Sequence, residues 1–270
     1  MNNLDLINKR INELLSKTHP KELKKATLYA INANAKRFRP LLTLTIIDIL
    51  GKNCKRGLDA ACSIEFIHTY SLIHDDLPCI DNDDFRRGRP SLHKVFPEWL
   101  ALLTGDFFLN FAFETLSNMK TISDKQKIKL IATLTKRSGD KCGMIGGQIL
   151  DMINSGKSNW KTIYYGKTAA LIIAAIEFGC IIANADNKTV KKLIKYGENI
   201  GLLYQIIDDL IDHETKKQSI LTNTKNPEIK KIIKNLYTST IKTLEKMPYN
   251  TKILENILRK IIDQFPTIKL

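Results

Sequence analysis

Apolar residues recur at helical spacing along nearly the whole chain of 270 residues. Near the start, Leu4, Ile7, Ile11 and Leu14 are separated by three or four positions, which puts them on one face of a helix. The same spacing recurs over residues 41–50, 60–74, 99–116, 125–136, 190–212 and 229–246. No convincing run of alternating apolar and polar residues between hairpin turns appears, so no sheet is expected. The sequence predicts an all-α fold.

The breaks between these helical stretches are short. They fall at Pro20, Gly51, 85–91, Pro97, around Gly139, Ser155–Ser158, Ala185–Lys188 and 213–228. None has the length or composition of an interdomain linker, and 43% of the residues are hydrophobic, enough for a substantial core. We therefore predict one domain over residues 1–270.

Charge and cysteine content bear on partners and compartment. A formal net charge of +14 would suit nucleic acid, but the lysines are spread among isoleucine and asparagine along the chain, so no nucleic-acid partner is predicted. Five cysteines without a CxxC pair argue against disulfides or zinc and favour the reducing cytoplasm. The start lacks a secretory core. Since Glu177 interrupts the longest apolar run, we expect a buried helix and no membrane insertion.

Two acidic clusters stand out from this background. The stretch "HDDLPCIDNDDFRRGRP", residues 74–90, holds five aspartates within ten positions and then three arginines. Asp75 and Asp76 end an apolar helical stretch, and Asp81 follows an expected kink at Pro78. In the second cluster, "YQIIDDLID" at residues 204–212, Asp208 and Asp212 lie one helical turn apart.

Carboxylates at this spacing repel one another unless a cation joins them. An EF-hand is excluded, because Arg86 and Leu92 occupy its glycine and glutamate positions counted from Asp81. Oxygen-rich, histidine-poor clusters instead favour magnesium, which completes its shell with water and phosphate. Five nearby basic or imidazole side chains suit two diphosphate groups: Lys36, Arg39, His68, Arg86 and Arg87.

Six segments, in this order, resemble the trans-type isoprenyl diphosphate synthases, in particular the bacterial and plant branch that makes farnesyl or geranylgeranyl diphosphate. They are "KRFRPLL", "HDDLPCIDNDDFRRGRPSLHKVF", "GDFFLNFAFE", "GMIGGQILDM", "GKTAAL" and "QIIDDLID", and they span roughly residues 30 to 212. The resemblance implies the isoprenoid synthase fold, a single large helical bundle around a deep central cavity, usually as a homodimer.

The resemblance also implies a role for each matching position. Asp75, Asp76 and Asp81 would hold two magnesium ions. Asp208, assisted by Asp209 and Asp212, would hold a third, with manganese as an alternative metal. Arg86 would contact the allylic diphosphate. The residues implied for the diphosphate of isopentenyl diphosphate are Lys36, Arg39, His68 and Arg87, and those implied near the reacting carbon are Lys167, Thr168 and Gln205.

The implied reaction joins an allylic diphosphate, dimethylallyl or geranyl, to isopentenyl diphosphate by ionisation, condensation and elimination. Tyr70 lies five residues before Asp75, roughly 7 to 8 Å along a helix. An aromatic residue there resembles the floor that limits the family's product to fifteen carbons. We predict a farnesyl diphosphate synthase, with geranylgeranyl diphosphate as the alternative product.

Two departures from the family pattern keep other hypotheses open. Asn34 and Ala35 stand where the family usually has two glycines, and the segment after Asp212 is compressed. In that segment Lys216, Lys217 and Lys225 are only candidates for the family's closing lysines. A non-catalytic partner subunit of a heteromeric synthase is therefore a second hypothesis. A class I terpene cyclase is a third, although "DDLID" has the prenyltransferase form of the motif.

Overall fold

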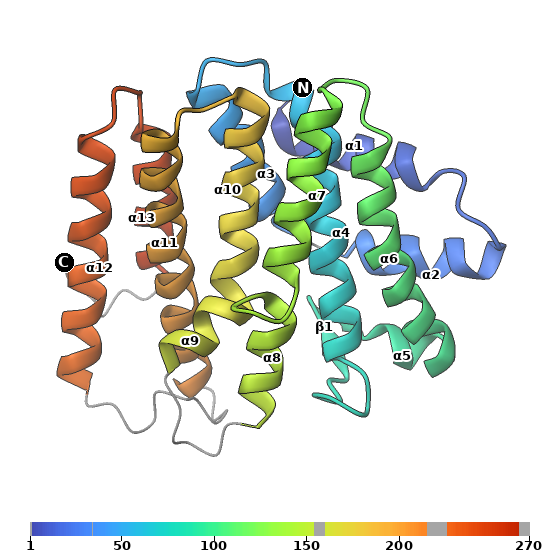
Figure 1. Cartoon of the computed structure of the whole chain (residues 1–270). Coiled ribbons are helices and arrows are strands. Elements are labelled where there is room, and N and C mark those ends of the chain that lie inside the picture. The colour runs from blue at the N-terminus through green and yellow to red at the C-terminus, as the bar shows by residue number, and fades with distance from the viewer. Residues whose placement is uncertain (1, 34, 154–159, 215–225, 265–270) are drawn as a thin grey trace. The chain divides into compact units, whose positions relative to one another are not determined.

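The computed structural model describes residues 2–33, 35–153, 160–214 and 226–264, and almost all of its regular structure is helical (Figure 1). The elements are α1 (Asn3–Leu15), α2 (Lys21–Ile31), α3 (Phe38–Ile49), the 3₁₀ turn η1 (Cys54–Gly57), α4 (Leu58–Asp75), β1 (Phe85–Arg86), β2 (Arg89–Pro90), α5 (Leu92–Val95), α6 (Glu98–Ser117), α7 (Asp124–Ser138), α8 (Met144–Met152), α9 (Trp160–Tyr164), the π-helix η2 (Tyr165–Ala169), α10 (Ala170–Ala183), α11 (Asn187–Glu214), α12 (Asn226–Glu245) and α13 (Lys252–Ile262). The all-α prediction is confirmed.

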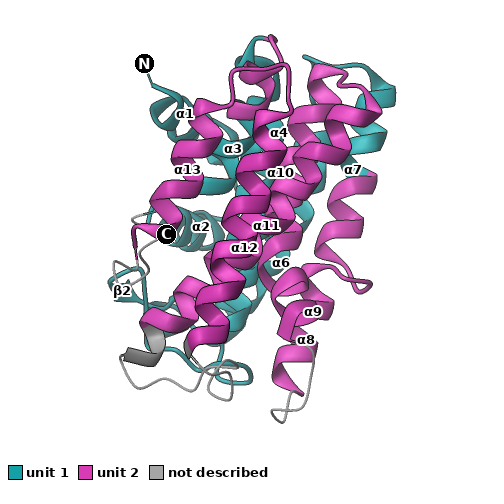
Figure 2. Cartoon of the chain, turned by 90° about the vertical axis from the view of Figure 1, so that its left-hand side faces the viewer, with its two compact units in different colours: residues 1–44, 53–131 teal, residues 45–52, 132–270 magenta. Residues whose placement is uncertain are grey.

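The chain divides into two compact units, coloured separately in Figure 2. Unit 1 comprises residues 1–44 and 53–131, and unit 2 comprises residues 45–52 and 132–270. A single domain around a deep cavity stays a prediction.

Unit 1 is built around α4, which is buried on nearly every side. This helix is apolar all round rather than on one stripe, as expected for a helix enclosed by others. It packs along α6, where the Phe66 ring stacks on Phe108 with centroids 5.7 Å apart and tilts against Phe111 at 5.2 Å. Ile7 and Ile11 of α1 are fully buried. These contacts hold the end of α4, where the first acidic cluster begins.

A two-stranded hairpin follows the acidic cluster, where no sheet was expected. Phe85 pairs with Pro90, and Arg86 pairs with Arg89. The two residues between them, Arg87 and Gly88, have φ angles of 54° and 75°, as a tight two-residue turn requires. Pattern analysis missed this hairpin because strands of two residues carry no alternation.

Unit 2 is centred on α10, which packs against α11 and is buried over almost its whole length. Among the described residues one stretch, Trp160–Ala183, is long and apolar enough to cross a membrane, but 83% of its 18-residue apolar window is buried inside the protein. It is longer than the apolar run in the sequence because α9 and η2 precede α10 without a break. The interpretation of this run as a buried helix is confirmed.

Candidate active site

The first acidic cluster forms a compact turn at the end of α4. The helix ends at Asp75, and the backbone N–H of Asp81 donates to the carbonyl oxygen of Asp75 at 2.9 Å. Asn82, with a φ of 51°, turns the chain back and donates to the carbonyl of Leu77. Asn tolerates this left-handed conformation better than most residues. The turn therefore puts Asp75 beside Asp81, although five residues separate them.

Asp76 lies on the inner side of this turn and is already bonded. Its carboxylate is buried, and its Oδ1 accepts hydrogen bonds from Nε of Arg86 at 2.8 Å and from Nη2 of the same side chain. Arg86 also donates to Asp83 at 3.0 Å. The sequence assigned Asp76 to metal and Arg86 to the allylic diphosphate, and in the structure these two side chains bind each other.

Three of the residues predicted to bind isopentenyl diphosphate come together in unit 1. Nη2 of Arg87 lies 3.4 Å from Nε2 of His68. Desolvation, followed by the charges of Arg39 and Arg87, lowers the pKa of His68 well below its ordinary value. A neutral imidazole that accepts from arginine through Nε2 carries its proton on Nδ1. His68 is therefore a neutral hydrogen-bond donor in this structure, whereas the sequence grouped it with the cations.

Lys36 lies in the loop before α3 and Arg39 lies in the first turn of that helix, and Arg37, to which no role was assigned, anchors this segment. Lys36 is exposed and Arg39 is half-buried. Between them Arg37 points inward with a φ of 48° and donates to Glu65 at 2.7 Å. Asn34 lies outside the described residues.

A small pocket adjoins the acidic turn in unit 1. Its lining includes Asp76 and Arg86 and the residues around Tyr29, whose ring lies under the guanidinium of Arg89 at 4.2 Å. Two buried hydroxyls in the lining, those of Thr69 and Ser91, have no hydrogen-bond partner among the described residues. Buried hydroxyls are usually satisfied, so this pocket suits water or a small polar group.

Tyr70 is buried and close to the same turn. Its ring meets His74 edge-on, with centroids 5.2 Å apart. Burial raises the pKa of the Tyr70 hydroxyl, and the charges of Asp75 and Asp106 add to the effect. The hydroxyl is therefore close enough to the acidic turn to feel its charge. The role of Tyr70 in limiting product length stays a prediction.

In unit 2 the second acidic cluster lies near the end of α11. Asp208 is exposed. Asp209 accepts a hydrogen bond from Nε2 of Gln205 at 2.8 Å on one oxygen and from the hydroxyl of Tyr164 on the other. Thr168 donates to Oε1 of Gln205 at 2.5 Å. The side chain of Asp212, and all of Lys216, Lys217 and Lys225, lie outside the described residues.

Lys167 is held by a residue on α8. Its Nζ donates to Asp151 at 2.6 Å. A Cβ on Gly147 would lie 2.1 Å from the backbone nitrogen of Lys167, so glycine is needed where α8 crosses η2. Lys167 and Thr168 belong to this π-helix, a form that is frequent at functional sites.

Residues of the "GMIGGQILDM" segment were not assigned individual roles. Asp151 and Gln148 are three positions apart, hence on one side of α8. The amide atoms of Gln148 are buried and have no hydrogen-bond partner among the described residues. The sequence could have indicated these two residues, because they form a polar pair at helical spacing within an otherwise apolar segment.

The donor set of the acidic turn consists of carboxylate oxygens, which magnesium prefers. Among the described residues, no group of three or more His, Cys, Asp and Glu side chains is arranged to hold a metal ion. The pair formed by Asp75 and Asp81 nevertheless fits magnesium, which is commonly bound by one or two carboxylates together with water and substrate phosphate.

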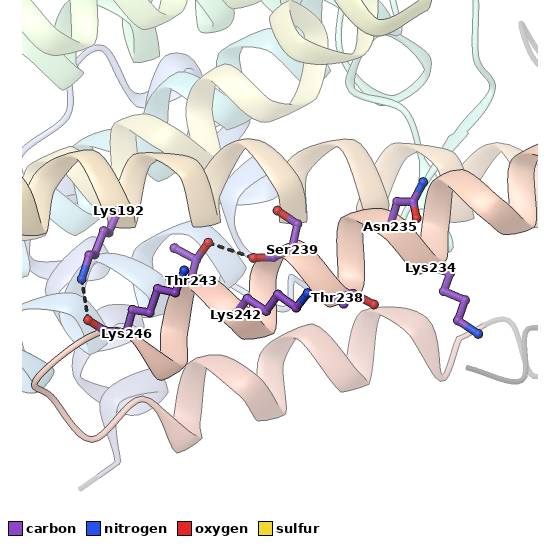
Figure 3. A pocket seen from close by; sticks show the side chains of 8 residues that line it. All are labelled: Lys192, Lys234, Asn235, Thr238, Ser239, Lys242, Thr243 and Lys246. Atoms are coloured by element: carbon purple, nitrogen blue, oxygen red, sulfur yellow. Dashed lines mark hydrogen bonds between the residues drawn. The ribbon is translucent and has the colours of Figure 1, made fainter.

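A basic groove runs along α12 in unit 2 (Figure 3). Its lining residues are Lys192, Lys234, Asn235, Thr238, Ser239, Lys242, Thr243 and Lys246. Lys192 donates to the carbonyl of Lys246, and Thr243 donates within its own helix to the carbonyl of Ser239 at 2.8 Å. The groove carries positive charge without a converging set of buried donors, so it is not the candidate active site.

Comparison with known proteins shows the family of this chain. The polyprenyl synthetase family model matches residues 20–263. Farnesyl diphosphate synthase of Geobacillus stearothermophilus is 42% identical over 207 residues, which cover 74% of this chain and 69% of that protein. The Micrococcus luteus enzyme of the same name is 39% identical over 93% of this chain and 94% of its own. Geranylgeranyl pyrophosphate synthase 7 of Arabidopsis thaliana is 37% identical, and the match covers 83% of this chain and 66% of that protein.

Two solved structures share the fold over almost the whole chain. An FPP/GFPP synthase from Zymomonas mobilis aligns with a TM-score of 0.85 and 32% identity, covering 96% of this chain and 95% of that one. A geranyltransferase from Legionella pneumophila aligns with a TM-score of 0.90 and 28% identity, covering 99% and 96%. With a family model that matches most of its length and named relatives at 39–42% identity, the chain belongs to the polyprenyl synthetase family, the trans-isoprenyl diphosphate synthases, and is a trans-prenyltransferase.

Proposed function

We propose that this chain condenses dimethylallyl or geranyl diphosphate with isopentenyl diphosphate and releases farnesyl diphosphate. The acidic turn carries the proposal. Asp81 folds back onto Asp75, and Arg87 and His68 meet in the same unit. A pair of carboxylates beside a basic cluster suits one diphosphate held through metal and another held directly.

Three magnesium ions are proposed, with manganese as the alternative. Asp75, Asp76 and Asp81 are the proposed ligands of two of these ions, and Asp208, assisted by Asp209 and Asp212, is the proposed ligand of the third. When bound, the ions neutralise the departing diphosphate. Prenyl synthases use divalent metal for this purpose, while the number of ions belongs to the proposal.

The chain's own residues then share the remaining work. Lys36, Arg39 and Arg87 bind the diphosphate of isopentenyl diphosphate, and His68 donates to it through Nδ1. The oxygens of Thr168 and Gln205 stabilise positive charge on the allylic carbon. The released pyrophosphate accepts the proton lost at the end, so no side chain must act as a strong base.

Farnesyl diphosphate is the favoured product for two reasons. The Geobacillus and Micrococcus relatives carry that name, and Tyr70 is a bulky buried side chain close to the acidic turn. Geranylgeranyl diphosphate is the alternative, as in the Arabidopsis relative.

A cytoplasmic homodimer completes the proposal, with no nucleic-acid partner and no membrane insertion. Large apolar side chains are exposed along the first half of α6, where Trp99 is 61% and Leu103 is 51% exposed. Exposed apolar side chains grouped on one helix are typical of a surface that another protein covers. A second copy of the chain is the proposed occupant.

The test is incubation with isopentenyl diphosphate, magnesium and, in separate reactions, dimethylallyl, geranyl and farnesyl diphosphates, followed by chain-length analysis. A fifteen-carbon diphosphate is expected, and EDTA should abolish its formation. Asp75→Asn and Asp208→Asn should each lower kcat at least about a hundredfold, because each removes charge facing the leaving group. Asp124→Asn is the control, since Asp124 is exposed and pairs with Lys127.

Each other outcome points to one of the rival hypotheses. No product with any allylic substrate would contradict the proposal and favour a non-catalytic subunit. A cyclic hydrocarbon would indicate a terpene cyclase. A twenty-carbon diphosphate would support the proposed condensation reaction and show that the product is geranylgeranyl rather than farnesyl diphosphate.

A further inference from the structure

We propose that Tyr164 is a positioning residue for the reaction, acting through Asp209 and Gln205 on the hydroxyl of Thr168. The inference rests on the proposed function and concerns a tyrosine to which the sequence assigned no role. Tyr164 is the last residue of α9, directly before the π-helix that contains Thr168.

The contacts form one continuous chain within unit 2. The Tyr164 side chain is almost completely buried, and its hydroxyl donates to Oδ2 of Asp209. The other carboxylate oxygen, Oδ1, accepts from Nε2 of Gln205 at 2.8 Å. Gln205 and Asp209 are four residues apart on α11, so they lie on one face of that helix. Asp209 therefore has a donor on each oxygen.

Charge fixes the direction of these hydrogen bonds. A carboxylate can only accept hydrogen bonds, so Asp209 must face the amide NH₂ group of Gln205 rather than the amide oxygen. The amide oxygen of Gln205 then faces Thr168 and accepts its hydroxyl hydrogen. With that hydrogen committed to Gln205, the lone pairs of Thr168 Oγ1 point elsewhere and are available to positive charge.

The tyrosine hydroxyl is what keeps Asp209 in this orientation. Without it, Oδ2 of Asp209 would lose that donor, and the carboxylate could rotate away from Gln205. The amide would then be free to turn over and offer its N–H groups to Thr168. In that arrangement the lone pair of Thr168 would accept from Gln205 and be lost to the allylic cation. The ring of Tyr164 packs on Trp160 with centroids 5.4 Å apart, and that packing does not need the hydroxyl.

Tyr164→Phe removes the hydroxyl and keeps the ring. We expect kcat to fall about tenfold, as loss of one oriented hydrogen bond would give. The KM for isopentenyl diphosphate should stay within about twofold, because the relay does not touch its basic residues. Tyr165→Phe is the matched control. The Tyr165 hydroxyl accepts from Arg137 at 2.9 Å, in a separate network with Glu177, so kcat should be unchanged.

A double-mutant cycle separates relay from general disturbance. On a Gln205→Leu background the relay is already broken, so adding Tyr164→Phe should lower kcat by less than about twofold. All variants are compared at a temperature at which circular dichroism shows each to be folded.

Two results would overturn the inference while the proposed function stands. One is an active wild type in which Tyr164→Phe behaves like Tyr165→Phe. The other is full additivity of Tyr164→Phe and Gln205→Leu. A wild type that makes no prenyl product would overturn the proposed function, and this inference with it.

Discussion

Arg37 and Glu65 form an ion pair in the interior of unit 1, with 2.7 Å between Nη1 and Oε1 and side chains only 3% and 2% exposed. The same guanidinium donates to the side chain of Asn8 at 3.1 Å and to the carbonyl of Ile31 at 2.6 Å. One arginine thus ties α1, the end of α2 and α4 to the loop before α3. That loop carries Lys36, and Arg39 follows in the first turn of α3, so the pair also positions two proposed ligands of isopentenyl diphosphate.

Removing one partner of this pair should destabilise the protein strongly. Glu65→Ala leaves a buried guanidinium without its counter-charge, and we expect the free energy of unfolding to fall by about 3–5 kcal/mol. Urea denaturation at pH 7 measures this loss. Glu198→Ala breaks an exposed pair with Lys195 and should change the same quantity by less than about 1 kcal/mol. Equal losses of unfolding free energy in both variants would contradict the conclusion that Arg37 and Glu65 form a buried ion pair.

Shortening Tyr70 should lengthen the product. If the ring limits the growing chain, Tyr70→Ala opens space below the acidic turn, and twenty-carbon diphosphate should replace much of the fifteen-carbon product. Chromatography of the dephosphorylated products measures the ratio. Tyr70→Phe keeps the ring and should leave the product unchanged. Fifteen carbons from both variants would remove Tyr70 from chain-length control.

Breaking the contact between Asp151 and Lys167 should weaken allylic substrate binding moderately. Asp151→Asn keeps the shape of the side chain but removes the charge that orients the ammonium. Because both groups are partly exposed, the expected effect is a rise of about two- to fivefold in the KM for geranyl diphosphate. Asp124→Asn breaks an exposed contact with Lys127 and should leave this KM unchanged. A fall in KM for Asp151→Asn would contradict the proposed orientation.

Asp186 caps α11, and its contribution to stability should depend on pH. Its carboxylate accepts from the hydroxyl and N–H of Thr189 and from the N–H of Lys188; the hydroxyl bond is the largest cause of its lowered pKa. A lowered folded pKa means that the contribution is complete above the ordinary value of about 3.9 and is lost as pH falls through the folded pKa.

The variant pair Asp186→Ala and Asp186→Asn tests this cap. At pH 7 the alanine variant should have a lower thermal midpoint than wild type, and the difference should shrink below about pH 4. Asparagine also caps helices well, so its midpoint at pH 7 should stay near wild type. A constant deficit for alanine at all pH values would argue against the cap.

Four of the five cysteines should divide into two classes of reactivity, with Cys54 of intermediate exposure. Cys79 and Cys142 are exposed, whereas Cys62 and Cys180 are buried. Burial raises the pKa of both buried thiols, that of Cys180 to about 12. At pH 8 iodoacetamide should therefore modify Cys79 and Cys142 in the folded protein and reach the other two only in denaturant. Peptide mass spectrometry distinguishes the sites, and early labelling of Cys180 would refute the prediction.

Local pattern was enough for much of the fold. The expected helices over 60–74, 99–116 and 190–212 appear as α4, α6 and α11, each slightly longer than expected. Short elements such as α2 and α8 and the hairpin at 85–90 were not predicted. They contain too few apolar residues to show a recognisable helical or strand period, and packing against other elements stabilises them.

The amino-acid sequence alone determined the helical class, the family and the acidic turn that ends α4, because periodicity, Pro78 and the spacing of Asp75 and Asp81 act over a few residues. Only the tertiary structure decided which charged groups are already engaged. Asp76 meets Arg86, Asp209 meets Tyr164, and His68 is neutral among arginines. These outcomes depend on residues far apart in the chain and on desolvation, which exists only once packing has removed water from around a charge.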